Sequence, residues 1–255
     1  MIANYHTHTT RCHHAVGQDE EYVRSAVEGG LQILGFSDHT PYLFSGGYVS
    51  PARMLPEELP GYCDSVRDLG QRYADRLEIH LGVEAEYYPL FWKDTLSLLR
   101  DNGVEYMILG QHEIENEIGQ IYILNPSDDR QRLCRYVRQV CEGMETGCFS
   151  YVAHPDVICF TGSKEYYREQ MRTLCRTANQ CGIPLEINLL GIRENRTYPT
   201  PCFWDLAAEE GCTVVLGCDA HHPTHAADLA SEAIAMEIIQ KLGLKYQTTV
   251  ELRKI

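Results

Sequence analysis

The chain has 255 residues, of which 44% are hydrophobic, and it carries a formal net charge of −14 at pH 7. This acidity argues against nucleic acid as the main partner, because proteins that hold a phosphate backbone usually present a basic face. No apolar run reaches the length of a membrane span, and His6 and His8 interrupt any signal-like run near the start of the chain. The 11 cysteines are odd in number and form no Cys-x-x-Cys pair, which favours buried thiols in a reducing compartment. We therefore expect a cytoplasmic protein with no membrane partner.

Short β-rich runs alternate with helix-like segments along the whole chain. The expected strands lie at 2–5, 33–37, 77–85, 104–109, 149–153, 185–188 and 213–217. The expected helices lie at 19–29, 56–73, 90–101, 129–142, 164–181, 201–210 and 226–242, and the Gly- and Pro-rich stretch 45–60 predicts a long loop. Seven βα units without a break in composition predict one α/β domain over residues 1–255, built on a parallel sheet.

Possible metal ligands follow six of the seven expected strands. His6 and His8 share one face after the first strand, since residues i and i+2 of an extended chain point the same way. A strand-end histidine taken alone is more often a hydrogen-bonding or packing residue, but the carboxyl ends of parallel strands are where active sites gather. The joint placement predicts a composite metal site. Its candidates at the other strand ends are Asp38 and His39, Glu84, His112, His154, and Asp219 and His221.

The ligand set consists of histidines and carboxylates. Such nitrogen and oxygen ligands suit Zn²⁺, Fe²⁺ or Mn²⁺, and the sequence does not decide between these metals. The candidates are too many for one catalytic ion, which usually has three protein ligands. We expect two or three divalent ions that share a bridging carboxylate.

Six stretches in chain order resemble the polymerase and histidinol phosphatase (PHP) superfamily of metallophosphoesterases, most closely its histidinol-phosphatase branch. They are HTHT (6–9), CHHA (12–15), GFSDHTP (35–41), GVEAEY (82–87), AHPD (153–156) and GCDAH (217–221). The resemblance implies a distorted (β/α)7 TIM-like barrel and a trinuclear site. In that site His6, His8, Glu84 and Asp219 would hold the first ion, Glu84, His112 and His154 the second, and His14, His39 and His221 the third.

Other residues are candidates for contact with a substrate. Arg193 and Arg196 follow the sixth expected strand, the only one without a metal ligand. A guanidinium group matches phosphate in a bidentate geometry, and the family often carries an arginine here, which favours Arg193. The alternative is a solvated loop arginine paired with Glu194. Arg11 is a further candidate, at a position where the family usually has an aromatic residue.

The segment around the fourth expected strand end also departs from the family, since Gly110-Gln111-His112 stands where Gly-Ser-Val-His is usual. Glu113 opens the acidic run that follows, and it would suit a cationic substrate. Asp219 and His221 are the nearest candidates for proton transfer to the leaving group, and that role stays open.

Phosphatase action on L-histidinol phosphate, giving L-histidinol in histidine biosynthesis, is the leading functional hypothesis. The closest alternative is hydrolysis of another small phosphate ester, such as a nucleotide or sugar phosphate. A non-catalytic metal-binding regulatory module is a third possibility, and the acidic charge disfavours a nuclease. The sequence leaves the oligomeric state open.

Overall fold

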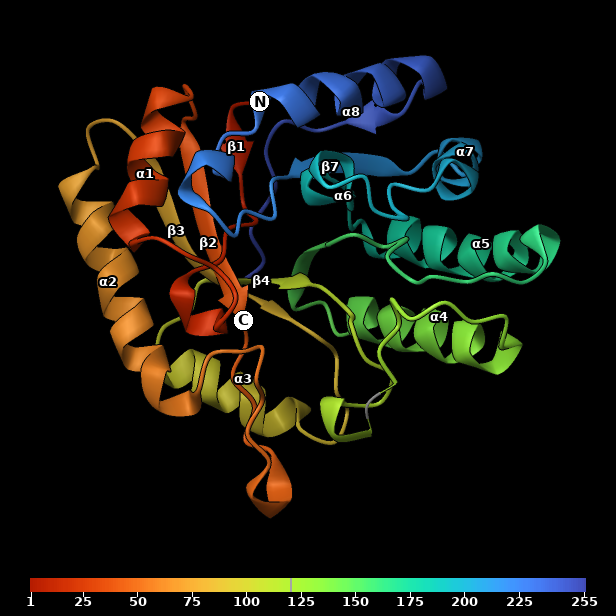
Figure 1. Cartoon of the computed structure of the whole chain (residues 1–255), viewed down its shortest axis with the longest axis horizontal. Helices are drawn as coiled ribbons and strands as arrows, with labels where there is room; N and C mark the ends of the chain where they lie inside the picture. Colours follow the sequence, from red (N-terminus) through yellow and green to blue (C-terminus); the bar gives the residue numbers. More distant parts are fainter. Residues whose placement is uncertain (120) are drawn as a thin grey trace.

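The computed structural model describes residues 1–119 and 121–255, which form a curled parallel sheet surrounded by helices (Figure 1). The sheet follows chain order, and each strand pairs in parallel with the next. This confirms the predicted TIM-like α/β fold. The strands are β1 (Ala3–Asn4), β2 (Ile33–His39), β3 (Glu78–Ala85), β4 (Tyr106–Leu109), β5 (Phe149–Val152), β6 (Leu185–Asn188), β7 (Thr213–Gly217) and β8 (Lys245–Tyr246).

The sheet closes on itself at the carboxyl ends of β1 and β7. The backbone N–H of His8 donates to the carbonyl of Ala220 at 3.0 Å, and the N–H of Ala220 donates to the carbonyl of His6 at 3.2 Å. These bonds form a parallel bridge between Thr7 and Ala220. Seven strands therefore surround the end that carries the predicted ligands.

The short strand β8 was not predicted. It pairs only with the first residues of β7, through Thr213 with Lys245 and Val214 with Tyr246. The two residues of β8 are too few to give a period-two pattern, so the sequence carried no signal for this strand.

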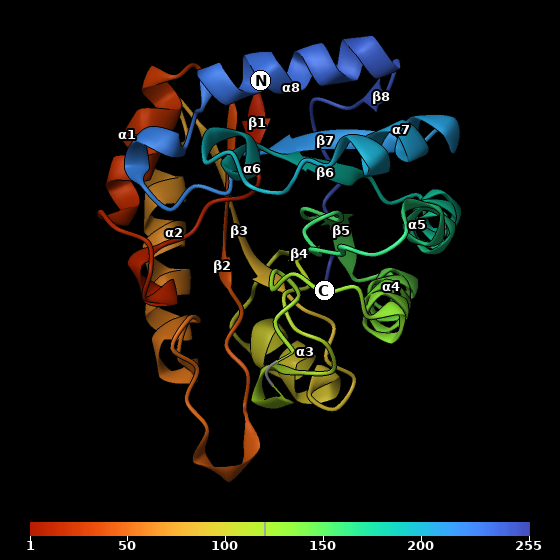
Figure 2. The same ribbon diagram turned by 45° about the vertical axis from the view of Figure 1, so that its right-hand side comes forward.

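The helices pack against the outside of the sheet (Figures 1 and 2). Two of the described helices begin at a side-chain cap and end at a glycine in the left-handed conformation: one is capped by Ser163 and ended by Gly182, the other is capped by Asp228 and ended by Gly243. No described helix is long and apolar enough to cross a membrane. The helices are α1 (Asp19–Glu28), α2 (Leu59–Arg72), α3 (Trp92–Asp101), α4 (Arg130–Glu145), α5 (Lys164–Cys181), α6 (Leu189–Arg193), α7 (Pro201–Glu209) and α8 (Leu229–Leu242).

Two helical predictions need correction. The expected helix 56–73 begins as a 3-10 turn over Pro56–Glu58, and α2 proper starts at Leu59. The segment after the sixth strand, where no helix is predicted, forms the one-turn helix α6, whose start is capped by the Asn188 side chain accepting the backbone N–H of Gly191.

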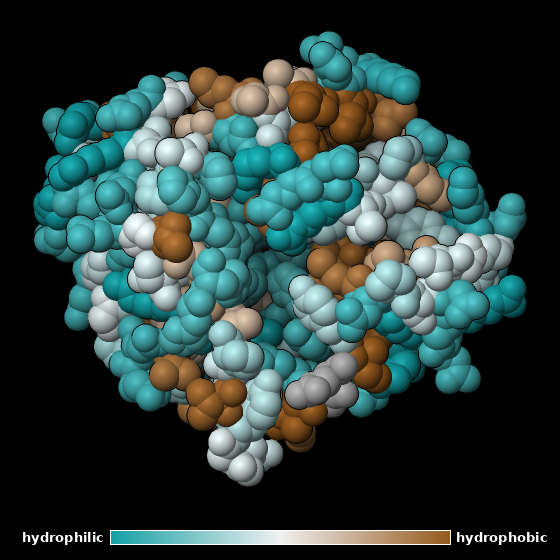
Figure 3. Space-filling model, in the orientation of Figure 1, coloured by the Kyte–Doolittle hydropathy of each residue, from teal (hydrophilic) through white to brown (hydrophobic). Residues whose placement is uncertain are grey.

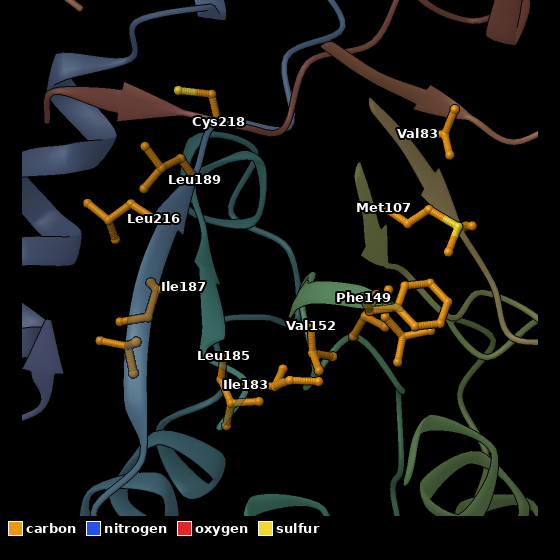
Figure 4. Packing of buried hydrophobic residues seen from close by; sticks show 14 of the residues in the cluster. Val83, Met107, Phe149, Val152, Ile183, Leu185, Ile187, Leu189, Leu216 and Cys218 are labelled. Atoms are coloured by element: carbon orange, nitrogen blue, oxygen red, sulfur yellow. The ribbon is translucent and has the colours of Figure 1, made fainter. Parts of the chain in front are cut away.

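Alternation along the strands separates two packed layers. Outward residues such as Leu185 and Ile187 join the core between sheet and helices, which Figure 4 shows together with Val83, Met107 and Phe149. Inward residues of the same strands face the barrel interior. Its apolar cluster contains Tyr5, Tyr106, Ile108, Tyr151, Val215 and, from the C-terminal segment, Val250.

Candidate metal centre and active site

All nine side chains predicted as metal ligands converge at the carboxyl ends of the strands. Four groups of three among them have ligand atoms that lie within 4.8 Å of one another. Two of these groups contain Glu84, and the other two are His6, His8 and Asp219, and His14, His39 and His221. These are the protein ligands expected for the first and third ions, apart from the bridging glutamate.

Glu84, the last but one residue of β3, lies between these groups. Its Oε1 atom is 2.9 Å from His154 Nε2 and 3.8 Å from His112 Nε2. Its Oε2 atom is 3.1 Å from His39 Nδ1 and 3.6 Å from the Nε2 atom of His8. One carboxylate therefore touches histidines from all three expected ion positions, which is the geometry that a bridging ligand needs.

Buried polar atoms without partners indicate that this centre fits metal ions. The Nε2 atoms of His6 and His8 are buried and have no hydrogen-bond partner among the described residues. Leaving such an atom unpaired costs about 1–3 kcal/mol, a penalty that metal coordination removes. The donor set, with imidazoles and carboxylates in direct contact, is that of divalent transition-metal sites.

Electrostatics also favours cations in the centre. Burial would lower the pKa of His8, but Asp219, Asp38 and Glu84 outweigh it and raise that pKa to about 9. Burial would raise the pKa of Glu84, but the surrounding histidines hold it well below its ordinary value. The carboxylates therefore attract positive charge, and a divalent ion would displace the imidazole proton. His14 is already a neutral donor, since burial and His221 lower its pKa to about 4.

Two carboxylates that were not assigned as ligands are hydrogen-bonded to histidines, and a third lies near His8 without a hydrogen bond to its ring. Glu186 Oε1 lies 2.8 Å from His6 Nδ1, and Glu86 Oε1 lies 2.9 Å from His112 Nδ1. Asp38 Oδ1 lies 3.5 Å from His8 Nδ1. A carboxylate on one ring nitrogen fixes the tautomer and leaves the other nitrogen free for a metal. Glu86 and Asp38 lie in the motifs GVEAEY and GFSDHTP, whereas Glu186 lies on the one expected strand without a predicted metal ligand.

Backbone geometry makes room for these groups. A Cβ atom on Gly110 would collide with Glu84 Oε1, and one on Gly217 would collide with Glu186 Oε1. His154 and Asp219 have positive φ angles of 30° and 48°, which non-glycine residues adopt at a cost. Strain of this kind is concentrated at functional sites, where the surrounding structure enforces it.

A cavity of about 300 Å³ opens over the centre. Figure 3 shows a hydrophilic hollow near the middle of this face. Its walls include Arg196, Tyr198, Glu113, Tyr122 and Arg53, and its floor is formed by predicted ligands, namely His14, His39, Glu84, His112, His154, Asp219 and His221.

The structure does not bring Arg193 or Arg11 into this cavity. Arg193 donates to Asp228 at 2.7 Å and to the carbonyl of Asp219 at 3.3 Å, so its guanidinium is occupied behind the metal centre. Arg11 is paired with Asp19 at 2.9 Å. The expected phosphate contact of these two arginines has no support in this geometry, because each guanidinium is paired with a carboxylate outside the cavity.

Comparison with known proteins agrees with the geometry. A probable histidinol-phosphatase of Deinococcus radiodurans is 31% identical over 244 residues, which cover 87% of each chain. A probable histidinol-phosphatase of Schizosaccharomyces pombe is 25% identical over 278 residues, covering 98% of this chain and 90% of the relative.

Solved structures share the fold. The histidinol phosphate phosphatase of Lactococcus lactis, crystallised with zinc, L-histidinol and phosphate, matches with a TM-score of 0.74 at 20% identity, over 96% of this chain and 94% of its own. A putative histidinol phosphatase of Listeria monocytogenes matches with a TM-score of 0.72 at 21% identity, over 91% and 99%. The model of the PHP domain matches residues 4–189, more than half of the chain. The chain therefore belongs to the PHP domain family of metal-dependent phosphatases.

Proposed function

We propose that this enzyme hydrolyses L-histidinol phosphate to L-histidinol and inorganic phosphate. The observation that carries the proposal is the convergence of nine side chains predicted as metal ligands under a small cavity, whose wall holds both a cationic and an anionic side chain. The relatives named as probable histidinol-phosphatases support the same substrate. We place the reaction in the cytoplasm, where the 11 cysteines, all of them free thiols, would stay reduced.

We assign the nine ligands to two or three ion positions. His6, His8, Glu84 and Asp219 would hold one ion, Glu84, His112 and His154 a second, and His14, His39 and His221 a third. When bound, such ions lower the pKa of coordinated water and neutralise phosphate oxygens.

The protein's own groups would bind the phosphate and move the proton. Arg196 is held by Glu194 at 2.7 Å and by the hydroxyl of Tyr198 at 3.2 Å, and it lines the cavity. It is therefore the arginine that we assign to phosphate. Burial would raise the pKa of Asp219, but His6 and His221 hold it well below its ordinary value. Asp219 is thus ionised and can orient the attacking water as a hydrogen-bond acceptor, and His221, 3.3 Å from it, is the neighbouring group that could relay the proton to the leaving oxygen.

Glu113 is our candidate for recognition of the cationic end of the substrate. Its Oε2 atom accepts hydrogen bonds from Tyr88 at 2.8 Å and from Arg53 at 3.3 Å. Within the described part of the chain, Oε1 has no such partner. Because Arg53 also faces Glu86 and Glu117, three carboxylates share one arginine, and this wall of the cavity is acidic. An ammonium group on the substrate would satisfy it better than a neutral sugar hydroxyl.

A substrate panel tests the function. The metal-loaded protein should hydrolyse L-histidinol phosphate with a kcat/KM at least ~100-fold above those for a sugar phosphate and a nucleoside monophosphate, a preference worth about 2.8 kcal/mol. A higher kcat/KM for either competitor would replace the proposed substrate. Retained metal without turnover of any phosphate ester would instead favour the regulatory module.

Two neighbouring glutamates separate recognition from chemistry. Glu113→Gln should raise KM for L-histidinol phosphate about 10-fold, as expected for a lost charge-assisted hydrogen bond, and leave p-nitrophenyl phosphate hydrolysis nearly unchanged. Glu115→Gln is the matched control, because Glu115 points outward to Arg135 at 2.6 Å. Equal effects of the two variants would remove Glu113 from the substrate site.

A further inference from the structure

Arg53 is a buried arginine that neither the metal centre nor the proposed chemistry uses directly. It lies on the long segment between β2 and α2, which projects from the body in Figure 2, yet its own exposure is only 4%. Its guanidinium lies 5.3 Å from the ring centre of Tyr42 and 5.9 Å from that of Tyr88. A charge held this deeply needs partners, and these partners lie on other loops.

The guanidinium joins three loops. Its two terminal nitrogens donate to the two oxygens of Glu86 at 2.7 and 2.8 Å, which is the bidentate fork that arginine forms with a carboxylate. Its Nε atom donates to Glu117, and one terminal nitrogen also reaches Glu113 at 3.3 Å. Glu86 follows β3, whereas Glu113 and Glu117 follow β4.

Glu86 connects this arginine to the metal centre. The same Oε1 atom that accepts a hydrogen bond from Arg53 lies 2.9 Å from His112 Nδ1. His112 then presents Nε2 toward Glu84, 3.8 Å away. His112 is on an irregular segment beyond the end of β4, so its backbone is not held by strand pairing and its ring relies on side-chain contacts. Its ring is held by Glu86, and the Glu86 carboxylate is held by the two short hydrogen bonds from Arg53 and a longer one of 3.4 Å from the Tyr42 hydroxyl.

We infer that Arg53 is a positioning residue, which holds Glu86 and through it His112 in the orientation that the second metal position requires. The inference deepens the proposed function and rests on it. The inference also gives the loop before α2 a role, since Arg53 reaches Glu86 only when this loop packs against the cavity wall.

Arg53→Met tests the inference through metal content as well as rate. We expect the variant, after dialysis against a weak chelator, to retain about one ion fewer per chain than the wild type. Its kcat should fall roughly 10- to 100-fold, the usual effect of losing an outer partner of a metal ligand. Arg53→Lys should recover part of both, because an ammonium cannot form the fork.

A double-mutant cycle identifies the path through Glu86. Glu86→Gln keeps an oxygen for His112 but removes the charge that Arg53 binds. Adding Arg53→Met to Glu86→Gln should change metal content and kcat little further, whereas independent roles would give additive losses. The control is Arg172→Met, which removes an arginine bound to Glu209 and Glu210 at the end of α7, on the outside of the barrel. That variant should match the wild type in metal content and kcat.

The outcomes separate the two proposals. A wild-type protein that binds no metal, or hydrolyses no phosphate ester, refutes the proposed function. A wild-type protein that does both, beside a folded Arg53→Met variant with unchanged metal content and kcat, overturns only the role of Arg53. If Arg53→Met does not fold, Arg53→Lys decides, and wild-type values in that variant overturn the inference equally.

Discussion

Glu186→Gln should lower the metal affinity of the centre, although Glu186 is not itself a predicted ligand and lies on β6, the strand without one. Glu186 is fully buried, and its two oxygens have different partners. Oε1 faces His6 Nδ1 at 2.8 Å, while Oε2 accepts the backbone N–H of His154 at 2.9 Å and the amide of Asn188 at 3.1 Å. Every partner donates when His6 coordinates through Nε2. A glutamine has one accepting oxygen and one donating nitrogen, so on one side its N–H group must face another hydrogen-bond donor.

Either orientation of the new amide is unfavourable. If its nitrogen faces His6, the ring must accept at Nδ1 and carry its proton on Nε2, which blocks the metal. If its nitrogen faces His154 and Asn188, two hydrogen bonds to the carboxylate are lost. A hydrogen bond to a charged group contributes about 1.5–3 kcal/mol, so we expect roughly a 10- to 150-fold loss in metal affinity.

Competition against a chelator, with elemental analysis of the dialysed protein, measures this loss directly. The control is Glu78→Gln, which changes a carboxylate 3.0 Å from His80 at the amino end of β3, away from the centre. Its metal affinity should equal that of the wild type. Wild-type affinity in Glu186→Gln would show that His6 needs no carboxylate, and the orienting role would have to be abandoned.

Three further predictions follow from the same geometry. Removal of the metals should lower Tm by about 8–16 °C in calorimetry. A metal at ~1,000 times its Kd adds about 4 kcal/mol of stability, and the Tm of a chain of this size shifts by about 2–4 °C per kcal/mol. An unchanged Tm would contradict the inference that metal ions satisfy the unpaired Nε2 atoms of His6 and His8. Gly110→Ala should cost about 1–3 kcal/mol in denaturant unfolding and release metal, because the new Cβ would meet Glu84, whereas Gly61→Ala, with open space around it, should do neither. Arg196→Ala should lower kcat/KM about 10- to 150-fold with metal content intact, while Arg193→Ala should lower metal content as well. The reverse pattern would assign the phosphate contact to Arg193.

The fold and the convergence of the proposed ligands could be predicted because both depend on local patterns. Strands of a parallel barrel are buried on both faces, so they stand out as short apolar runs, and their carboxyl ends meet whatever the loops do. His6, His39 and His154 could therefore be expected together without any knowledge of distances. The pairing of β8 and the one-turn helix α6 depended on only a few residues each, and their signals were too short to detect.

The direction of long side chains could not be predicted in the same way. Arg193 and Arg196 are three residues apart, so a sequence pattern places both near the site. The structure separates them because α6 points Arg193 back to Asp228, while Arg196, beyond the helix, reaches Tyr198 and the cavity. No sequence pattern indicated the role of Arg53, since the carboxylates that it binds are at least 33 residues away along the chain.

The inward position of Glu186 follows from the alternation of residues in the sixth strand. In the sixth strand, Leu185 and Ile187 alternate with Glu186 and Asn188, and the apolar pair faces the helices. The polar pair must then face the barrel interior, where a buried carboxylate needs charged or hydrogen-bonding partners. The strand that supplies no ligand thus supplies the group that orients ligands on both sides, His6 after β1 and His154 after β5. A barrel mouth that concentrates metal ligands also needs such anchors, and an inward carboxylate on a strand without a ligand is the place to look for one.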